Sequence, residues 1–241
     1  MGSTGLVVPR GGRLSGKIKR EPITGNMSSW ENALRRGEVN PDIEHAALYD
    51  RQGNPIVGYQ GDRHSVPIEQ RVLQSDGTLT HFHPDQSFGG TLSMQDLKVF
   101  AQSNLGELRA VTNQGQLYSI RANSNVDRQG LAKWVRSNQR LAQKNFNNSY
   151  RRALREATTP LKSGPHKGEV KLTSRQTVRD ANGNRREVTK VTYRKPMTAQ
   201  QAINYARTYS VGMFDRMYGK ALSRYGVTYT STRAGRNSDR R

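Results

Sequence analysis

The sequence predicts an α+β fold, in which a compact mixed unit precedes a basic long helix, a β-hairpin and a C-terminal helix. Short apolar runs between turn residues predict strands in residues 41–125. Apolar residues near helical spacing, from Leu131 to Leu154, predict the long helix. Asn182-Gly183 between two alternating runs is typical of a β-hairpin. With 33% hydrophobic and 24% charged residues among 241, we expect the core to serve only part of the chain.

Residues 1–40 are rich in Gly, Ser and Arg, and they contain scattered Pro. This composition predicts a basic extended arm rather than a packed domain. A short helix is expected at SSWENALRRG, where Ser28 and Glu31 have the spacing of a capping box and Gly37 provides the stop.

The compact unit, residues 41–125, is expected to begin with a hairpin, because IEHAALYD and PIVGYQ flank the turn residues RQGN. SVPIEQRVLQ is compatible with a short helix or a loop. GTLTHFH alternates as a strand does, and Pro84 ends it. Ser93 then opens a helix over MQDLKVFAQSN, and ELRAVTN and QLYSIRA form a second hairpin.

The C-terminal part is expected to contain the long basic helix at 126–157, capped by Ser124 and Asp127. Residues 158–241 follow as a linker, a hairpin, a helix and a flexible tail. The last helix begins after Pro196 with a capping box at Thr198 and Gln201, and Gly226 ends it.

The composition excludes sites that depend on cysteine, and it argues against a membrane-spanning helix. The chain has no cysteine, so it contains no disulfide, no thiolate metal ligand and no cysteine nucleophile. It also lacks an apolar run of about 18 residues, so we expect no membrane-spanning helix and no membrane partner.

Charge is distributed unevenly along the sequence. Residues 126–241 contain 26 Lys and Arg against 7 Asp and Glu, whereas residues 41–125 contain 6 against 9. Such a basic block predicts a polyanionic partner, and sequence-independent DNA binding is the first candidate, with an acidic protein surface as the alternative. The expected phosphate contacts are Arg151, Arg152, Arg155, Lys171, Arg175, Arg179, Arg185, Arg186, Lys190, Arg194 and Lys195.

A second candidate site lies in THFHPDQSFGGTLSMQD. His81 and His83 are two apart in an expected strand, so their side chains share one face. Asp96, at the start of the next helix, would supply an oxygen ligand. Two imidazoles, a carboxylate and a water are typical of a catalytic zinc site, in which the metal lowers the pKa of the water to about 7. Glu44 is the candidate proton carrier.

A structural interpretation of the same residues stays open. Ser93-x-x-Asp96 also has the spacing of a helix capping box, which needs no metal. On residue types alone, the helix cap and the metal site are close alternatives.

The order of these motifs resembles that of the JAB/MPN (JAMM) metallohydrolases, in particular the JAB-like domains attached to phage head-morphogenesis (minor head) proteins. Here E44-HAALYDRQGN, which contains an Asp-x-x-Gly turn, precedes T80-HFHP, LSMQDL and AVTNQGQLYSI. The resemblance covers residues 41–122, about a third of the chain. Phe82 between the histidines and the longer loop before Ser93 depart from the family pattern.

The resemblance implies that His81, His83 and Asp96 bind zinc, that Glu44 is the general base and that Ser93 helps to hold the oxyanion. It also implies a virion protein of the minor head or head–tail connector kind, assembled in the host cytoplasm into a large particle with other virion subunits. Three functions stay open. The chain is a virion structural protein whose JAB-like domain has kept or lost its metal, an active zinc isopeptidase or peptidase, or a DNA-binding protein unrelated to phages.

Overall fold

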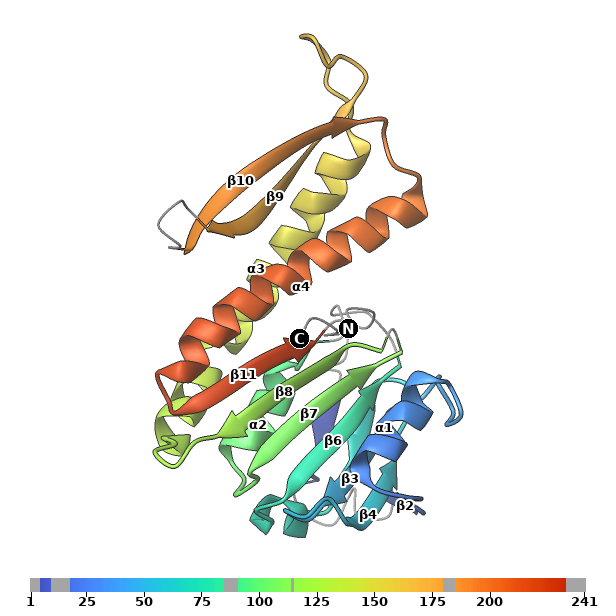
Figure 1. The fold of residues 1–241 in the computed structure, drawn as a ribbon, viewed down its shortest axis with the longest axis vertical. Coiled ribbons are helices and arrows are strands. Elements are labelled where there is room, and N and C mark those ends of the chain that lie inside the picture. The colour runs from blue at the N-terminus through green and yellow to red at the C-terminus, as the bar shows by residue number, and fades with distance from the viewer. Residues whose placement is uncertain (1–4, 10–17, 85–90, 114, 180–184, 233–241) are drawn as a thin grey trace. The chain divides into compact units, whose positions relative to one another are not determined.

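The computed structural model describes residues 5–9, 18–84, 91–113, 115–179 and 185–232. The chain divides into two compact units. Residues 1–142 and 214–241 form the first unit, and residues 143–213 form the second. The expected α+β class is confirmed, since the chain combines a mixed sheet with several helices (Figure 1).

The first unit is built around a seven-stranded sheet (Figure 1). Strands β6 and β7 are parallel to each other, and the other neighbouring strands are antiparallel. The order across the sheet is β11 (Val227–Thr232), β8 (Leu117–Ala122), β7 (Glu107–Thr112), β6 (Thr78–His83), β3 (His45–Tyr49), β4 (Pro55–Gln60) and β2 (Lys19–Glu21).

Helix α1 (Met27–Arg35) covers one face of this sheet. Phe82 of β6 lies in the core beneath it, together with Trp30 and Leu34 of the helix and Val111 of β7. Thr80, also on this face, donates a hydrogen bond from Oγ1 to Glu31 of the helix at 3.0 Å. The even-numbered residues of β6 therefore face α1.

The odd-numbered residues of β6 face the opposite side, because side chains alternate along a strand. His81 and His83 lie on this side, and helix α2 (Met94–Ala101) packs there against β7. Phe82 departs from the pattern of the family that the sequence resembles. This residue belongs to the core under α1 and does not line the face that carries the histidines.

A second small sheet lies on the histidine side. Strand β1 (Gly5–Val7) pairs in parallel with β5 (Ser65–Pro67), and β1 also packs against α2. A side chain at Gly61 would collide with the backbone of Ser65 and Val66, so glycine allows β5 to cross closely after β4. A short 3-10 helix, η2 (Gln70–Gln74), follows β5.

Both hairpins predicted in the compact unit are present, as β3–β4 and β7–β8. In the first turn, the Asp50 carboxylate accepts hydrogen bonds from the N–H groups of Gln52 and Asn54 at 2.9 and 2.8 Å. Gly53 has a φ of +86°, which favours glycine. The strand ending at Pro84 and the helix opened by Ser93 are also confirmed.

The N-terminal region differs from the expected extended arm. Strand β2 joins the main sheet, Leu6 and Trp30 are buried, and α1 begins one residue after Asn26. The predicted capping box at Ser28 is wrong, because Asn26 Oδ1 accepts the N–H of Ser29 at 3.0 Å. The apolar residues of the arm are too few to form a core alone, but they complete a core provided by the sheet.

Helix α3 (Arg128–Thr158) begins later than the predicted helix. The Oδ1 of Asp127 accepts the N–H of Gly130 at 2.8 Å, so Asp127 rather than Ser124 caps it. The C-terminal tail also differs from the expectation, since Val227–Thr232 forms β11 along β8. The prediction of a flexible tail is therefore wrong for the residues up to Thr232. The remaining residues of the tail, 233–241, lie outside the described residues.

The second unit contains the predicted hairpin and the first part of the predicted last helix, up to Met213. Strands β9 (Val170–Arg179) and β10 (Arg185–Arg194) are antiparallel, and the Asn182-Gly183 turn lies outside the described residues. Helix α4 (Ala199–Ser223) starts with the predicted capping box, in which Thr198 N–H donates to Gln201 Oε1 at 3.1 Å. The core of this unit contains Ala157, Val170, Leu172 and Ala202.

None of the helices in the described ranges combines the length and the apolar composition needed to cross a bilayer.

The core under α1 should be sensitive to the loss of Phe82. Phe82→Ala removes a fully buried ring, and we expect it to lower the free energy of unfolding by about 3–5 kcal/mol. Urea unfolding followed by tryptophan fluorescence, to which Trp30 of the same core cluster and Trp134 both contribute, measures the change. Ile56→Ala, at a side chain that is 53% exposed, is the control and should change it by less than about 1 kcal/mol.

Candidate metal centre

Strand β6 brings two imidazoles to the same place. His81 pairs with Ala46 of β3 on one side and with Ala110 of β7 on the other, so it lies in the middle of the sheet. His83 lies two residues further on the same face, and both histidines are buried. Small alanine side chains on both neighbouring strands leave room for the rings.

Helix α2 provides the carboxylate. Ser93 caps the helix by accepting the N–H of Asp96 at 3.1 Å, and Asp96 Oδ2 accepts the N–H of Ser93 at 2.7 Å. The capping box is therefore present, as one of the two interpretations expected. The same hydrogen bonds orient the Asp96 side chain toward β6.

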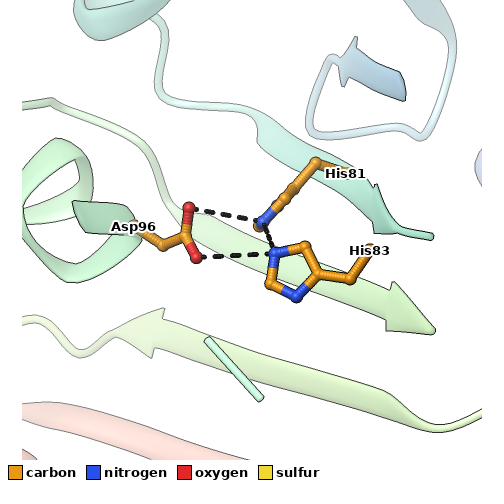
Figure 2. A group of neighbouring side chains, drawn as sticks. All are labelled: His81, His83 and Asp96. Carbon is orange, nitrogen blue, oxygen red and sulfur yellow. Dashed lines mark hydrogen bonds and ion pairs between the residues drawn. The ribbon is translucent and has the colours of Figure 1, made fainter. Parts of the chain in front are cut away.

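Three potential ligand atoms converge between the strand and the helix (Figure 2). Nε2 of His81 lies 2.8 Å from Nε2 of His83 and 3.3 Å from Oδ1 of Asp96. Nε2 of His83 lies 3.7 Å from Oδ2 of Asp96. Ligand atoms bound tetrahedrally at about 2.0–2.1 Å are separated by about 3.3 Å. The observed separations lie on both sides of this value, and one ligand atom from each residue lies within 4.8 Å of the others, so the group could hold a cation such as zinc.

The carboxyl group of Asp96 is ionised. Burial raises its pKa, but the neighbouring imidazoles of His81 and His83 and the backbone N–H of Leu6 lower it more, so that the pKa lies well below its usual range. Asp96 thus presents a negative charge in a fully buried position. A buried anion of this kind is a strong ligand for a cation.

His81 and His83 use the same ring nitrogen toward the cluster. Nδ1 of His81 is buried and has no hydrogen-bond partner among the described residues. Its Nε2 makes the ring's contacts to His83 and Asp96. Nε2 is therefore the ring nitrogen of His81 that faces His83 and Asp96.

Strand β1 contributes a contact that the sequence did not indicate. The backbone N–H of Leu6 donates to Oδ1 of Asp96 at 3.0 Å, and Leu6 is fully buried. No motif marks Leu6, and 90 residues separate it from Asp96. Only its apolar run, LVV, distinguishes this segment from the polar residues around it.

Glu44, the expected general base, lies immediately before β3 and is buried. Ala46 is opposite His81 in the antiparallel pair β3–β6. Continuing that register by two residues places Glu44 opposite His83, on the same face of the sheet. Its backbone is fixed by hydrogen bonds to Asp62 and Gly61 at 2.7 and 2.8 Å. Glu44 thus lies on the side of the sheet that also carries His81 and His83.

The other two histidines of this region do not join the cluster. His45 is buried, with Nδ1 2.9 Å from the carboxylate of Glu21 and Nε2 3.0 Å from the carbonyl oxygen of Asn40. His64 is exposed. His45 thus links Glu21 and Asn40, and His64 is a surface residue.

The basic residues of the second unit do not form one ribbon face. In the register of β9 and β10, Lys171 is opposite Tyr193, whereas Arg194 is opposite Val170. Lys171 therefore lies on one face of the hairpin, and Lys190 and Arg194 lie on the other. Arg151, Arg152 and Arg155 lie on α3, and Lys195 follows β10.

No family model, curated protein or solved structure matches this chain.

A metal titration tests the cluster directly. We expect the purified chain to bind about one zinc ion, because three protein ligands with an open fourth position form a complete site. His81→Ala/His83→Ala should abolish this binding, as measured by elemental mass spectrometry after dialysis. His64→Ala, at an exposed histidine outside the cluster, is the control and should retain the zinc. A double variant with unchanged zinc content would exclude this site.

Proposed function

We propose that the first unit is a zinc-dependent hydrolase of amide bonds, a peptidase or isopeptidase with a JAB/MPN-like fold. The convergence of His81, His83 and Asp96 carries this proposal. The order of Glu44, His-x-His and Ser-x-x-Asp along β3, β6 and α2 supports the family resemblance. A zinc ion held by these residues would supply Lewis-acid activation of water at neutral pH.

Each protein group has a role that its position supports. Asp96 and the two imidazoles would hold the metal. Glu44 on the same face would take a proton from the water that adds to the amide carbon and return it to the leaving nitrogen as the C–N bond breaks, as a general base and then a general acid. Its burial shields this proton transfer from bulk solvent.

Ser93 is suited to donate a hydrogen bond to the oxyanion that develops on the substrate carbonyl. Its Oγ accepts the N–H of Asp96, and a hydroxyl that accepts one hydrogen bond still has its own proton to donate. Ser93 is partly exposed, in contrast to Asp96. A carbonyl oxygen entering from solvent thus meets a donor fixed at the helix terminus, which stabilises the charge that develops on it.

Glu44→Gln separates chemistry from metal binding. The amide has the shape of the carboxylate but does not accept a proton, so we expect hydrolysis to fall by about 10²- to 10⁴-fold. Zinc content should stay at the wild-type value. Cleavage of a fluorogenic peptide library measures the first effect, and elemental analysis measures the second.

Glu38→Gln, an exposed residue paired with Arg36, is the matched control. Equal hydrolysis by wild type and Glu44→Gln would remove Glu44 from the mechanism. Absence of cleavage by a zinc-loaded wild-type chain, across the whole library, would count against the hydrolase itself.

We propose a second function for the second unit, sequence-independent binding of DNA. Residues 143–213 contain 15 Lys and Arg against 4 Asp and Glu. Lys171, Lys190 and Arg194 are exposed. Together with the resemblance to phage head-morphogenesis proteins, this charge supports a virion protein that contacts DNA or acidic partner subunits in a large assembly.

Salt dependence tests the DNA contacts. When a substitution removes one contact between a basic side chain and a phosphate of duplex DNA, the slope of log K against log salt becomes less steep by about 0.9. Lys171→Gln/Lys190→Gln/Arg194→Gln should therefore reduce it by up to about 3 units, with similar losses on unrelated sequences. Fluorescence anisotropy of a labelled duplex at several salt concentrations measures this. An unchanged slope would remove these residues from the interface.

A further inference from the structure

Strand β1 connects two separate elements beside the metal ligands. On one edge, the carbonyl oxygen of Val7 accepts the N–H of Ile68 at 2.9 Å, which continues the pairing with β5. Successive residues of a strand direct their N–H groups to opposite edges. The N–H of Leu6 accordingly points away from β5, and it donates to Asp96 at the start of α2.

Asp96 is consequently held from two sides. Ser93 N–H binds Oδ2 at 2.7 Å, and Leu6 N–H binds Oδ1 at 3.0 Å. Each donor uses one lone-pair position of the oxygen that it binds. A carboxylate oxygen can accept a further bond, and both oxygens also face an imidazole Nε2. Losing the Leu6 contact would leave Ser93, in its own helix cap, as the backbone donor to the carboxylate.

Burial makes this contact part of the folded site. Leu6 and Val66, which are opposite each other in the β1–β5 pair, are both fully buried, as is Ile68. The Leu6–Asp96 hydrogen bond is buried as well. Water is therefore not available to replace the Leu6 donor while β1 remains docked.

We propose that the N-terminal strand β1 is a positioning element of the metal centre, and that its docking and metal binding are thermodynamically coupled through the Leu6–Asp96 hydrogen bond. This inference rests on the proposed metal site and adds a control element to it. A chain whose N-terminal strand is displaced, by a partner or by processing, would hold its metal more weakly. The N-terminus would thereby regulate the site without contributing a ligand.

Coupling is reciprocal, so it has two measurable sides. Leu6→Pro removes the N–H, whereas Leu6→Ala retains the N–H and removes the buried side chain. Groups that orient metal ligands typically change metal affinity by about 10- to 100-fold. We expect Leu6→Pro to bind zinc at least about 10-fold more weakly than Leu6→Ala, in competition with a chromophoric chelator.

The second measurement uses the wild-type chain and does not depend on a variant that folds. Zinc should slow hydrogen exchange at the Leu6 amide, and it should leave the amide of Gln52, in the distant β3–β4 turn, unchanged. Circular dichroism confirms that both variants are folded.

The outcomes separate this inference from the proposed function. If wild type binds zinc, but the two variants bind equally and zinc leaves Leu6 exchange unchanged, the coupling is wrong and the metal site stands. If wild type binds no zinc, the metal site fails and the coupling fails with it. Weaker binding by Leu6→Pro together with slower Leu6 exchange supports both.

Discussion

The architecture of the candidate site depends on one buried charge, the carboxylate of Asp96. An uncompensated buried anion destabilises a fold by several kcal/mol, so it must be surrounded by donors or cations. The chain supplies two backbone N–H groups, from Leu6 and Ser93, and two imidazoles, from His81 and His83. These groups come from β1, the turn before α2, and β6. Compensation of a single charge thus determines how three distant segments must meet.

The helix cap and the metal ligand are not competing explanations of Ser93-x-x-Asp96. The sequence presents them as alternatives, since a capping box needs no metal. In the structure, Asp96 Oδ2 accepts the Ser93 N–H while both oxygens also face imidazole nitrogens. A carboxylate has about four lone-pair positions, and one hydrogen bond from the cap uses only one of them. The cap therefore orients a ligand and leaves its remaining positions for a cation.

Short-range chemistry made much of the first unit predictable. The Asp50 turn, the Ser93 cap and the alternation of β6 each depend on residues a few positions apart, and each was predicted correctly. Features that depend on partners far away in the sequence were not predicted. The pairing of β1 with β5, the pairing of β11 with β8, and the Leu6–Asp96 contact have no local signal. The face of each basic residue on β9 and β10 depends on the register between the strands, which residue spacing within one strand does not reveal.

The two polar clusters on opposite faces of β6 differ in what can complete them. Under α1, Glu31 accepts hydrogen bonds from Thr80 and Arg109, each at 3.0 Å, so acceptors and donors are matched within the protein. On the other face, two imidazole nitrogens and a carboxylate meet, and each can offer a lone pair. Protein donors between them arise only by placing protons on the rings. The Glu31 cluster is complete without an ion, whereas the histidine cluster is completed either by protons on the imidazoles, as in the 2.8 Å contact between Nε2 of His81 and Nε2 of His83, or by a metal ion in place of those protons.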